Sequence, residues 1–353
     1  GIIADRWIPA QRLLSISHFL AALFMGLTGY YGMTAGEHAE FSILFTFYSL
    51  SVAFYMPTLA LSNSVAYTAL DKAGLDTIKT FPPIRIFGTI GFICSMWMVD
   101  LLGLQNSYGQ FFACALIGLV YAVYALTLPA CPVSKGGSSK SLVEALGLRA
   151  FTLFKQKKMA LFFIFSMLLG VSLQITNGFA NPYISSFGIL ISLSQISETL
   201  CILLIPFFLK RFGIKQVMLI AMMAWVLRFG LFGAGNPGSG VWMFVLSMIV
   251  YGVAFDFFNI SGSLFVDRET TKDIRSSAQG LFVIMTNGFG ATIGTLGAQA
   301  IVNHFVDFSS SEPQISQWQS AWYVFAAYAL VVAVVFALVF KYKHQPEKEA
   351  SKH

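Results

Sequence analysis

Ten long apolar stretches are the feature that most restricts how this chain can fold. About 20 consecutive apolar residues cross the hydrocarbon core of a bilayer as one helix. Only 11% of the 353 residues are charged, against about 25% in an ordinary soluble domain. The sequence therefore predicts an all-α membrane protein with about ten transmembrane helices. The apolar runs cover residues 13–33, 42–70, 80–101, 109–130, 159–182, 189–209, 216–235, 241–265, 276–303 and 319–340.

The basic residues are sorted between the connections. Of the 22 Lys and Arg residues, only Arg85 and Arg228 lie outside the two ends and one alternating set of loops. The other loops contain acidic residues such as Glu37 and Glu312. Because cytoplasmic loops of membrane proteins are enriched in Lys and Arg, we expect both ends and the 131–158 connection to be cytoplasmic. A net charge of +6 distributed in this way predicts contact with a lipid bilayer and no nucleic-acid partner.

The longest connection suggests two halves. Asp5-Arg6-Trp7 precedes the first apolar run much as Lys210-Arg211-Phe212 precedes the seventh, which indicates a weak internal repeat. On this basis we expect a parent protein with twelve helices, two of which would precede Gly1. The expected organisation is the remainder of an N-terminal six-helix half at 1–130 (helices 3–6), a cytoplasmic linker at 131–158, a C-terminal six-helix half at 159–345 (helices 7–12) and a cytoplasmic tail at 346–353.

The sequence contains no pattern of catalytic or metal-binding chemistry. Cys94, Cys114, Cys131 and Cys201 form no CxxC or Cys/His cluster, so we interpret them as small packing residues. Neither a phosphate-binding loop nor a nucleophile–base motif is present. We therefore expect a protein that is not an enzyme and that uses no metal or organic cofactor.

Polar residues within the apolar runs are the candidates for function, because a charge at mid-membrane costs about 2.5–3.5 kcal/mol on insertion scales. Arg85 shares one helix face with Thr89 and Phe92. A cation, a hydroxyl and a ring on one face can hold a polar, partly planar solute. The alternative is that Arg85 extends to the cytoplasmic interface. For Arg228, near the outer end of its run, such snorkelling is the simpler interpretation.

Two further runs carry amides and a carboxylate at helical spacing. Gln174 and Asn177 can both donate and accept hydrogen bonds, which suits a solute rich in hydroxyls or ring nitrogens. Alternatively, they join neighbouring helices. Gln195 and Glu198 are again three residues apart. Burial disfavours a charged carboxylate, so Glu198 is a candidate for taking up and releasing a proton, unless an unseen cation pairs with it.

The eighth run places two aromatic rings beside a carboxylate. Tyr251 and Phe255 share a face, and Asp256 lies one step around the helix. These residues could stack a base and hydrogen-bond a sugar hydroxyl, whereas an aromatic stripe alone more often indicates packing. In the ninth run, the segment 286–290 (TNGFG) favours close helix packing.

At these residues the chain resembles the bacterial nucleoside–proton symporters of the major facilitator superfamily. The opening Gly1 to Arg6 is similar to that superfamily's cytoplasmic motif between helices two and three, whereas the link at 182–190 is shorter than in the family. The other matching stretches are Tyr55-Met56-Pro57-Thr58-Leu59, Phe81 to Phe92, Phe162 to Gly170, Leu173 to Asn177, Ser192 to Leu200 and Leu246 to Ser263.

The resemblance implies a monomeric carrier that imports nucleosides such as uridine or adenosine with protons, by alternating access across the bacterial inner membrane. It implies no cofactor other than the coupling proton, for which Glu198 and Asp256 are the candidates. A carrier for another neutral polar solute such as a sugar, or an inactive transporter fragment, are the alternatives. The substrate site implied by the family consists of Arg85, Thr89, Phe92, Gln174, Asn177, Gln195, Glu198, Tyr251, Phe255 and Asp256.

Overall fold

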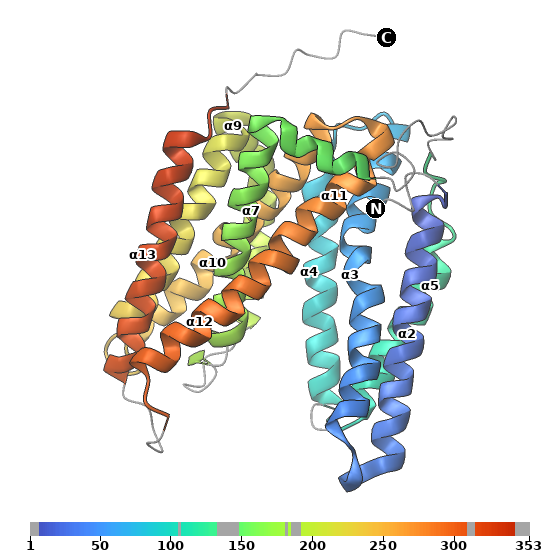
Figure 1. The fold of residues 1–353 in the computed structure, drawn as a ribbon, viewed down its shortest axis with the longest axis horizontal. Coiled ribbons are helices and arrows are strands. Elements are labelled where there is room, and N and C mark those ends of the chain that lie inside the picture. Colours follow the sequence, from blue (N-terminus) through green and yellow to red (C-terminus); the bar gives the residue numbers. More distant parts are fainter. Residues whose placement is uncertain are drawn as a thin grey trace. The chain divides into compact units, whose positions relative to one another are not determined.

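The computed structural model describes residues 7–104, 107–132, 148–180, 183–184, 192–308 and 315–342, and every regular element in these ranges is helical (Figure 1). The all-α prediction is confirmed. The elements are α2 (Ala10–Ala35), η1 (Gly36–His38), α3 (Phe41–Lys72), α4 (Thr77–Leu101), α5 (Gly109–Ala125), η2 (Leu148–Lys155), α7 (Lys157–Ile175), η3 (Thr176–Ala180), α9 (Ser192–Ala234), α10 (Val241–Glu269), η4 (Lys272–Ile274), α11 (Arg275–Val283), η5 (Ile284–Gly290), α12 (Ala291–Phe305) and α13 (Ile315–Val339).

Eight helices in the described ranges are long and apolar enough to cross a membrane, compared with the ten predicted runs. Two local features explain the difference. α9 covers two predicted runs, and its backbone breaks at Gly213, where φ is 77° and ψ is 168°. Glycine adopts such a positive φ without steric cost. α5 is apolar but has only 17 helical residues, so it is shorter than the other candidate spans.

The chain divides into two compact units, and the first consists of Gly1–Thr77, Ile90–Thr152 and Val266–Val283. Within its described part, α2 packs against both α3 and α5 (Figure 1). Hydroxyl groups join these helices, because Ser15 Oγ donates to the carbonyl oxygen of Ala122 at 2.6 Å and Ser51 Oγ to that of Ala21 at 2.7 Å. Such interhelical bonds supplement packing where lipid supplies no hydrophobic driving force.

Cys131 belongs to the small core of this unit, as predicted for a packing residue. It is buried in a cluster with Leu14, Leu61 and Val65. Burial raises the pKa of the Cys131 thiol, which disfavours the reactive thiolate. Cys94 and Cys114 instead lie exposed on their helices, so the structure does not support the interpretation of these two cysteines as packing residues.

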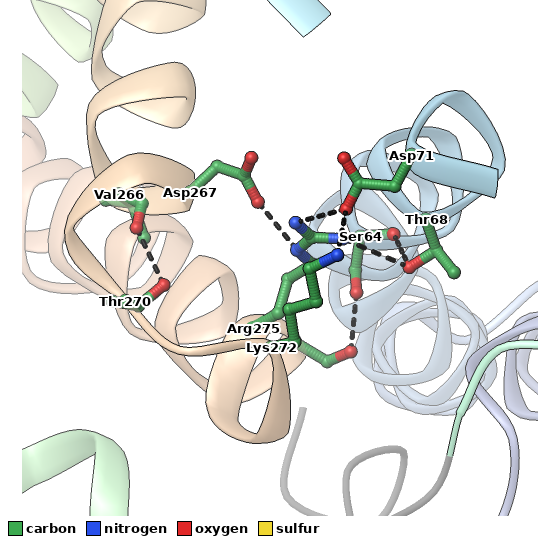
Figure 2. A network of polar contacts seen from close by, with 9 residues as sticks. Ser64, Thr68, Asp71, Val266, Asp267, Thr270, Lys272 and Arg275 are labelled. Atoms are coloured by element: carbon green, nitrogen blue, oxygen red, sulfur yellow. Dashed lines mark hydrogen bonds and ion pairs between the residues drawn. The ribbon is translucent and has the colours of Figure 1, made fainter. Parts of the chain in front are cut away.

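An ion-pair cluster around the buried Arg275 joins distant segments of the first unit (Figure 2). Arg275, at the start of α11, places Nη2 at 2.9 Å from Asp71 Oδ2 and Nε at 2.6 Å from Asp267 Oδ1. Lys272 Nζ lies 3.4 Å from the same Asp71 oxygen, but the Lys272 side chain is 74% exposed. Arg275 therefore connects the end of α3 with the end of α10.

The second unit consists of Ile78–Thr89, Leu153–Phe265 and Ile284–His353. Here α13 packs against α9, and α7 packs against η5 and α12. A Cβ atom on Gly290 would lie 2.5 Å from the carbonyl oxygen of Met167, so this contact between η5 and α7 requires glycine. The predicted packing role of the segment 286–290 is confirmed. Both η3 and η5 are π-helical, a geometry often found at functional sites.

Candidate functional site

The candidate site in the second unit is built around Glu198 of α9. The Glu198 side chain is 5% exposed, and its Oε1 accepts a hydrogen bond of 2.8 Å from Thr89 Oγ1. Thr89 is itself 2% exposed and lies in the α4 segment that belongs to this unit. Residues 109 positions apart in the sequence are thus joined inside the helical bundle.

Close contact between α9 and α10 holds Glu198 in place. A Cβ atom on Gly252 would lie 2.7 Å from the carbonyl oxygen of Ser197 and 2.8 Å from the backbone nitrogen of Glu198. Ser197 Oγ also donates a hydrogen bond to the carbonyl oxygen of Ile249. The backbone that carries Glu198 therefore lies directly against α10, which supplies the next group of site residues.

α10 contributes two stacked rings and a second carboxylate. The Tyr251 and Phe255 rings are parallel within 2°, with their centroids 5.7 Å apart. Asp256 is fully buried, and neither of its carboxylate oxygens has a hydrogen-bond partner among the described residues. A buried carboxylate without such partners is costly when charged, so it requires a proton, a cation or a polar ligand.

Arg85 supplies positive charge to both acidic groups. It lies close enough to interact electrostatically with Glu198 and with Asp256. Its guanidinium group lies alongside α4 next to Gly88, since a Cβ atom on Gly88 would lie 2.5 Å from Arg85 Nη1. The cation, Thr89 and the two carboxylates therefore form one polar cluster within the second unit, beside the stacked rings of α10.

The structure does not join the other predicted site residues to the polar cluster around Glu198 by hydrogen bonds in the described part of the chain. Gln174 is half-buried on α7, where its Cβ packs near Gly294, and Asn177 is exposed on η3. In the described part of the chain, neither amide is hydrogen-bonded to Glu198 or Asp256. Phe92 lies in the α4 segment of the first unit, and the residue is 51% exposed. Gln195 lies on α9, but its side chain is outside the described part of the structure.

The position of Arg228 differs from the one interpreted from the sequence. Snorkelling of this side chain to the membrane surface is wrong, because Arg228 has an exposed fraction of 0%. Its Nη1 donates to the carbonyl oxygen of Ser247 at 2.6 Å, and its Cζ lies 4.7 Å from the centroid of the Tyr251 ring. One signal could have indicated burial: Phe232 lies one helical turn further on, and its ring centroid is 5.1 Å from Cζ.

Comparisons with known proteins agree with this architecture. A family profile described as "Nucleoside H+ symporter" matches residues 1–345. The xanthosine permease of Escherichia coli (strain K12) is 48% identical over 364 residues, covering 99% of this chain and 84% of the permease. The nucleoside permease NupG of the same organism is 46% identical over 360 residues, covering 98% and 83%. A crystal structure of a NupG mutant superposes with a TM-score of 0.72 at 44% identity, covering 97% of this chain and 86% of that one.

Proposed function

Because this chain belongs to the nucleoside H+ symporter family, we propose that it carries nucleosides into the cell together with protons, by alternating access. Membership of this family confirms the prediction of a transporter with a major facilitator-like helical fold, rather than an enzyme. We assign the alternating movement to the halves 1–130 and 159–345, which the 131–158 linker connects. Both ends and this linker lie on the cytoplasmic side of the bacterial inner membrane in this proposal, and the carrier works as a monomer.

The observation that carries the proposal is the pair of buried carboxylates, Glu198 and Asp256, beside Arg85. Two carboxylates that interact in a poorly solvated interior cannot both carry charge cheaply. When one carboxylate takes up a proton, part of this free-energy cost is removed. When the proton is released, the cost returns. If nucleoside binding changes the surroundings of either group, binding and protonation become coupled, which is the thermodynamic requirement of symport.

Recognition of the nucleoside is assigned to groups of matching chemistry. The Tyr251 and Phe255 rings present π-faces on which a nucleobase gains more stacking energy than a sugar does. Arg85 and Thr89 can donate hydrogen bonds to base or ribose oxygens. Asp256, whose oxygens are without a hydrogen-bond partner in the described part of the chain, can accept a hydrogen bond from a ribose hydroxyl.

Four further residues complete the proposed substrate site. The amides of Gln174, Asn177 and Gln195 can each donate to and accept from a ring edge, as neutral nucleosides require. Phe92 adds a further aromatic surface. The relatives carry xanthosine and nucleosides according to their names, and we extend that substrate class to this chain.

Uptake of radiolabelled uridine into proteoliposomes tests the proposal. Uptake against a concentration gradient should require an inward proton gradient and should stop when an uncoupler is added. Glu198→Gln should abolish accumulation while leaving downhill exchange measurable, since the amide keeps the shape but cannot release a proton. Glu40→Gln, which changes an exposed loop carboxylate, is the matched control and should behave like the unmodified protein. Gradient-independent accumulation, or competition by a disaccharide but not by adenosine, would contradict the proposal.

A further inference from the structure

Arg228 is a buried cation without an acidic partner in the described residues. It lies in the second part of α9, and its exposed fraction is 0%. Nη1 donates to a backbone carbonyl, whereas Nε and Nη2 have no hydrogen-bond partner among the described residues. A buried charge within an apolar helix is expensive, so its retention requires a compensating interaction.

The ring of Tyr251 supplies that interaction. The Arg228 Cζ lies 4.7 Å from the ring centroid, well within the range of a cation–π contact. Removal from water strengthens such a contact, and both side chains are buried. The rings of Trp225 and Tyr251 also form a T-shaped contact, with centroids 6.1 Å apart and an interplanar angle of 82°. Tyr251 is therefore held by groups of α9 while its ring stacks on Phe255 of its own helix.

The Ser247 contact makes Arg228 a fixed support rather than a mobile one. Ser247 and Tyr251 are one helical turn apart on α10, and Arg228 contacts both, at 2.6 Å through Nη1 and at 4.7 Å through the guanidinium carbon. A planar guanidinium that is held by a hydrogen bond at one nitrogen and also lies over a ring is restricted in its orientation. Arg228 of α9 consequently helps to determine the plane of the Tyr251 ring, in addition to the rotamer of Tyr251 itself.

We propose that Arg228 is a positioning residue that sets the affinity for nucleosides by orienting the Tyr251 ring. This inference rests on the proposed function, because Tyr251 is assigned there to nucleobase stacking. Arg228 acts through the ring and does not itself contact the solute. Loss of the guanidinium leaves the Tyr251 side chain in place but allows its plane to vary, so the ring is no longer preorganised for stacking.

A double-mutant cycle between Arg228 and Tyr251 tests this inference. The full chain is purified in detergent, and uridine binding is measured for Arg228→Met, Tyr251→Leu and the double variant. Arg228→Met should weaken binding up to about 30-fold when Tyr251 is present, which is the effect of losing one desolvated cation–π contact. The same change should have less than about a twofold effect when residue 251 is leucine. Equal effects in both backgrounds would overturn the inference.

Transport kinetics and a conservative variant separate positioning from general stability. Arg228→Met should raise KM for uridine with little change in the maximal rate. Arg228→Lys keeps a cation near the ring and should recover part of the affinity. Phe232→Leu is the matched control, because it removes the other ring near the guanidinium, 5.1 Å away. It should lower the melting temperature without changing KM. If Arg228→Met lowers only the melting temperature, the positioning role is wrong.

A spectroscopic measurement keeps this inference independent of the proposed substrate. Near-ultraviolet circular dichroism reports the fixed environment of aromatic rings without any ligand. The near-ultraviolet spectrum of Arg228→Met should differ clearly from that of the unmodified protein. The spectra of Tyr251→Leu and of the double variant should be the same. If the unmodified chain binds no nucleoside, the proposed function fails, but this spectral coupling still decides whether Arg228 orients Tyr251. An unchanged spectrum would refute it.

Discussion

At the scale of single residues, Thr89 makes a direct hydrogen bond to the central carboxylate of the candidate site. Its hydroxyl is buried and donates to Glu198 Oε1 at 2.8 Å. A hydrogen bond to a charged acceptor contributes about 1.5–3 kcal/mol, and about 1.4 kcal/mol corresponds to a factor of ten. Thr89→Val keeps the shape of the side chain but removes the donor. We expect it to reduce the initial rate of uridine uptake about tenfold or more.

The serine variant provides the control for this prediction. Thr89→Ser retains the hydroxyl and loses only a methyl group, so its uptake should stay close to that of the unmodified protein. Both variants are compared in proteoliposomes that contain equal amounts of protein. Unimpaired uptake by Thr89→Val would show that the bond to Glu198 has no part in transport.

At the scale of elements, the contact of α9 with α10 depends on Gly252. Gly252→Ala would place a Cβ atom 2.7 Å from the carbonyl oxygen of Ser197, so the helices must separate beside Glu198. Overpacking of this kind costs about 1–3 kcal/mol. We expect a lower melting temperature in detergent together with slower uptake. Gly230→Ala is the matched control, because this α9 glycine has open space around its Cβ position and alanine favours the helix. Equal melting temperatures of the two variants would contradict this account.

The elements themselves were largely predictable from the sequence, whereas their contacts were not. Apolar length determines where a helix can cross lipid, so the predicted runs coincide with helices. The bond between Thr89 and Glu198 depends on which helix faces meet, and neither residue's own run contains that information. The prediction that Arg228 snorkels was wrong for the same reason. The distance of a cation from a helix end cannot distinguish snorkelling from burial when its partner, Tyr251, lies on another helix.

At the scale of the whole molecule, the first compact unit is assembled from three separate stretches of chain, and Arg275 ties the last of these to the first. Removing one partner of a buried ion pair costs about 3–5 kcal/mol, because the remaining charge stays buried and unpaired. Arg275→Gln leaves Asp267, whose side chain is 8% exposed, without this cation, whereas Asp71 keeps its ion pair with Lys272. We therefore expect a clearly lower melting temperature and increased proteolysis at the end of α3, measured on the full chain in detergent.

Lys272→Gln distinguishes this effect from a general loss of positive charge. Lys272 also pairs with Asp71, at 3.4 Å, but its side chain is 74% exposed. Exposed ion pairs typically contribute only about 0–1 kcal/mol, so this variant should melt close to the unmodified protein. The two substitutions remove the same charge from the same cluster and differ in burial. If they were equally destabilising, net charge rather than the buried guanidinium would hold the distant segments together.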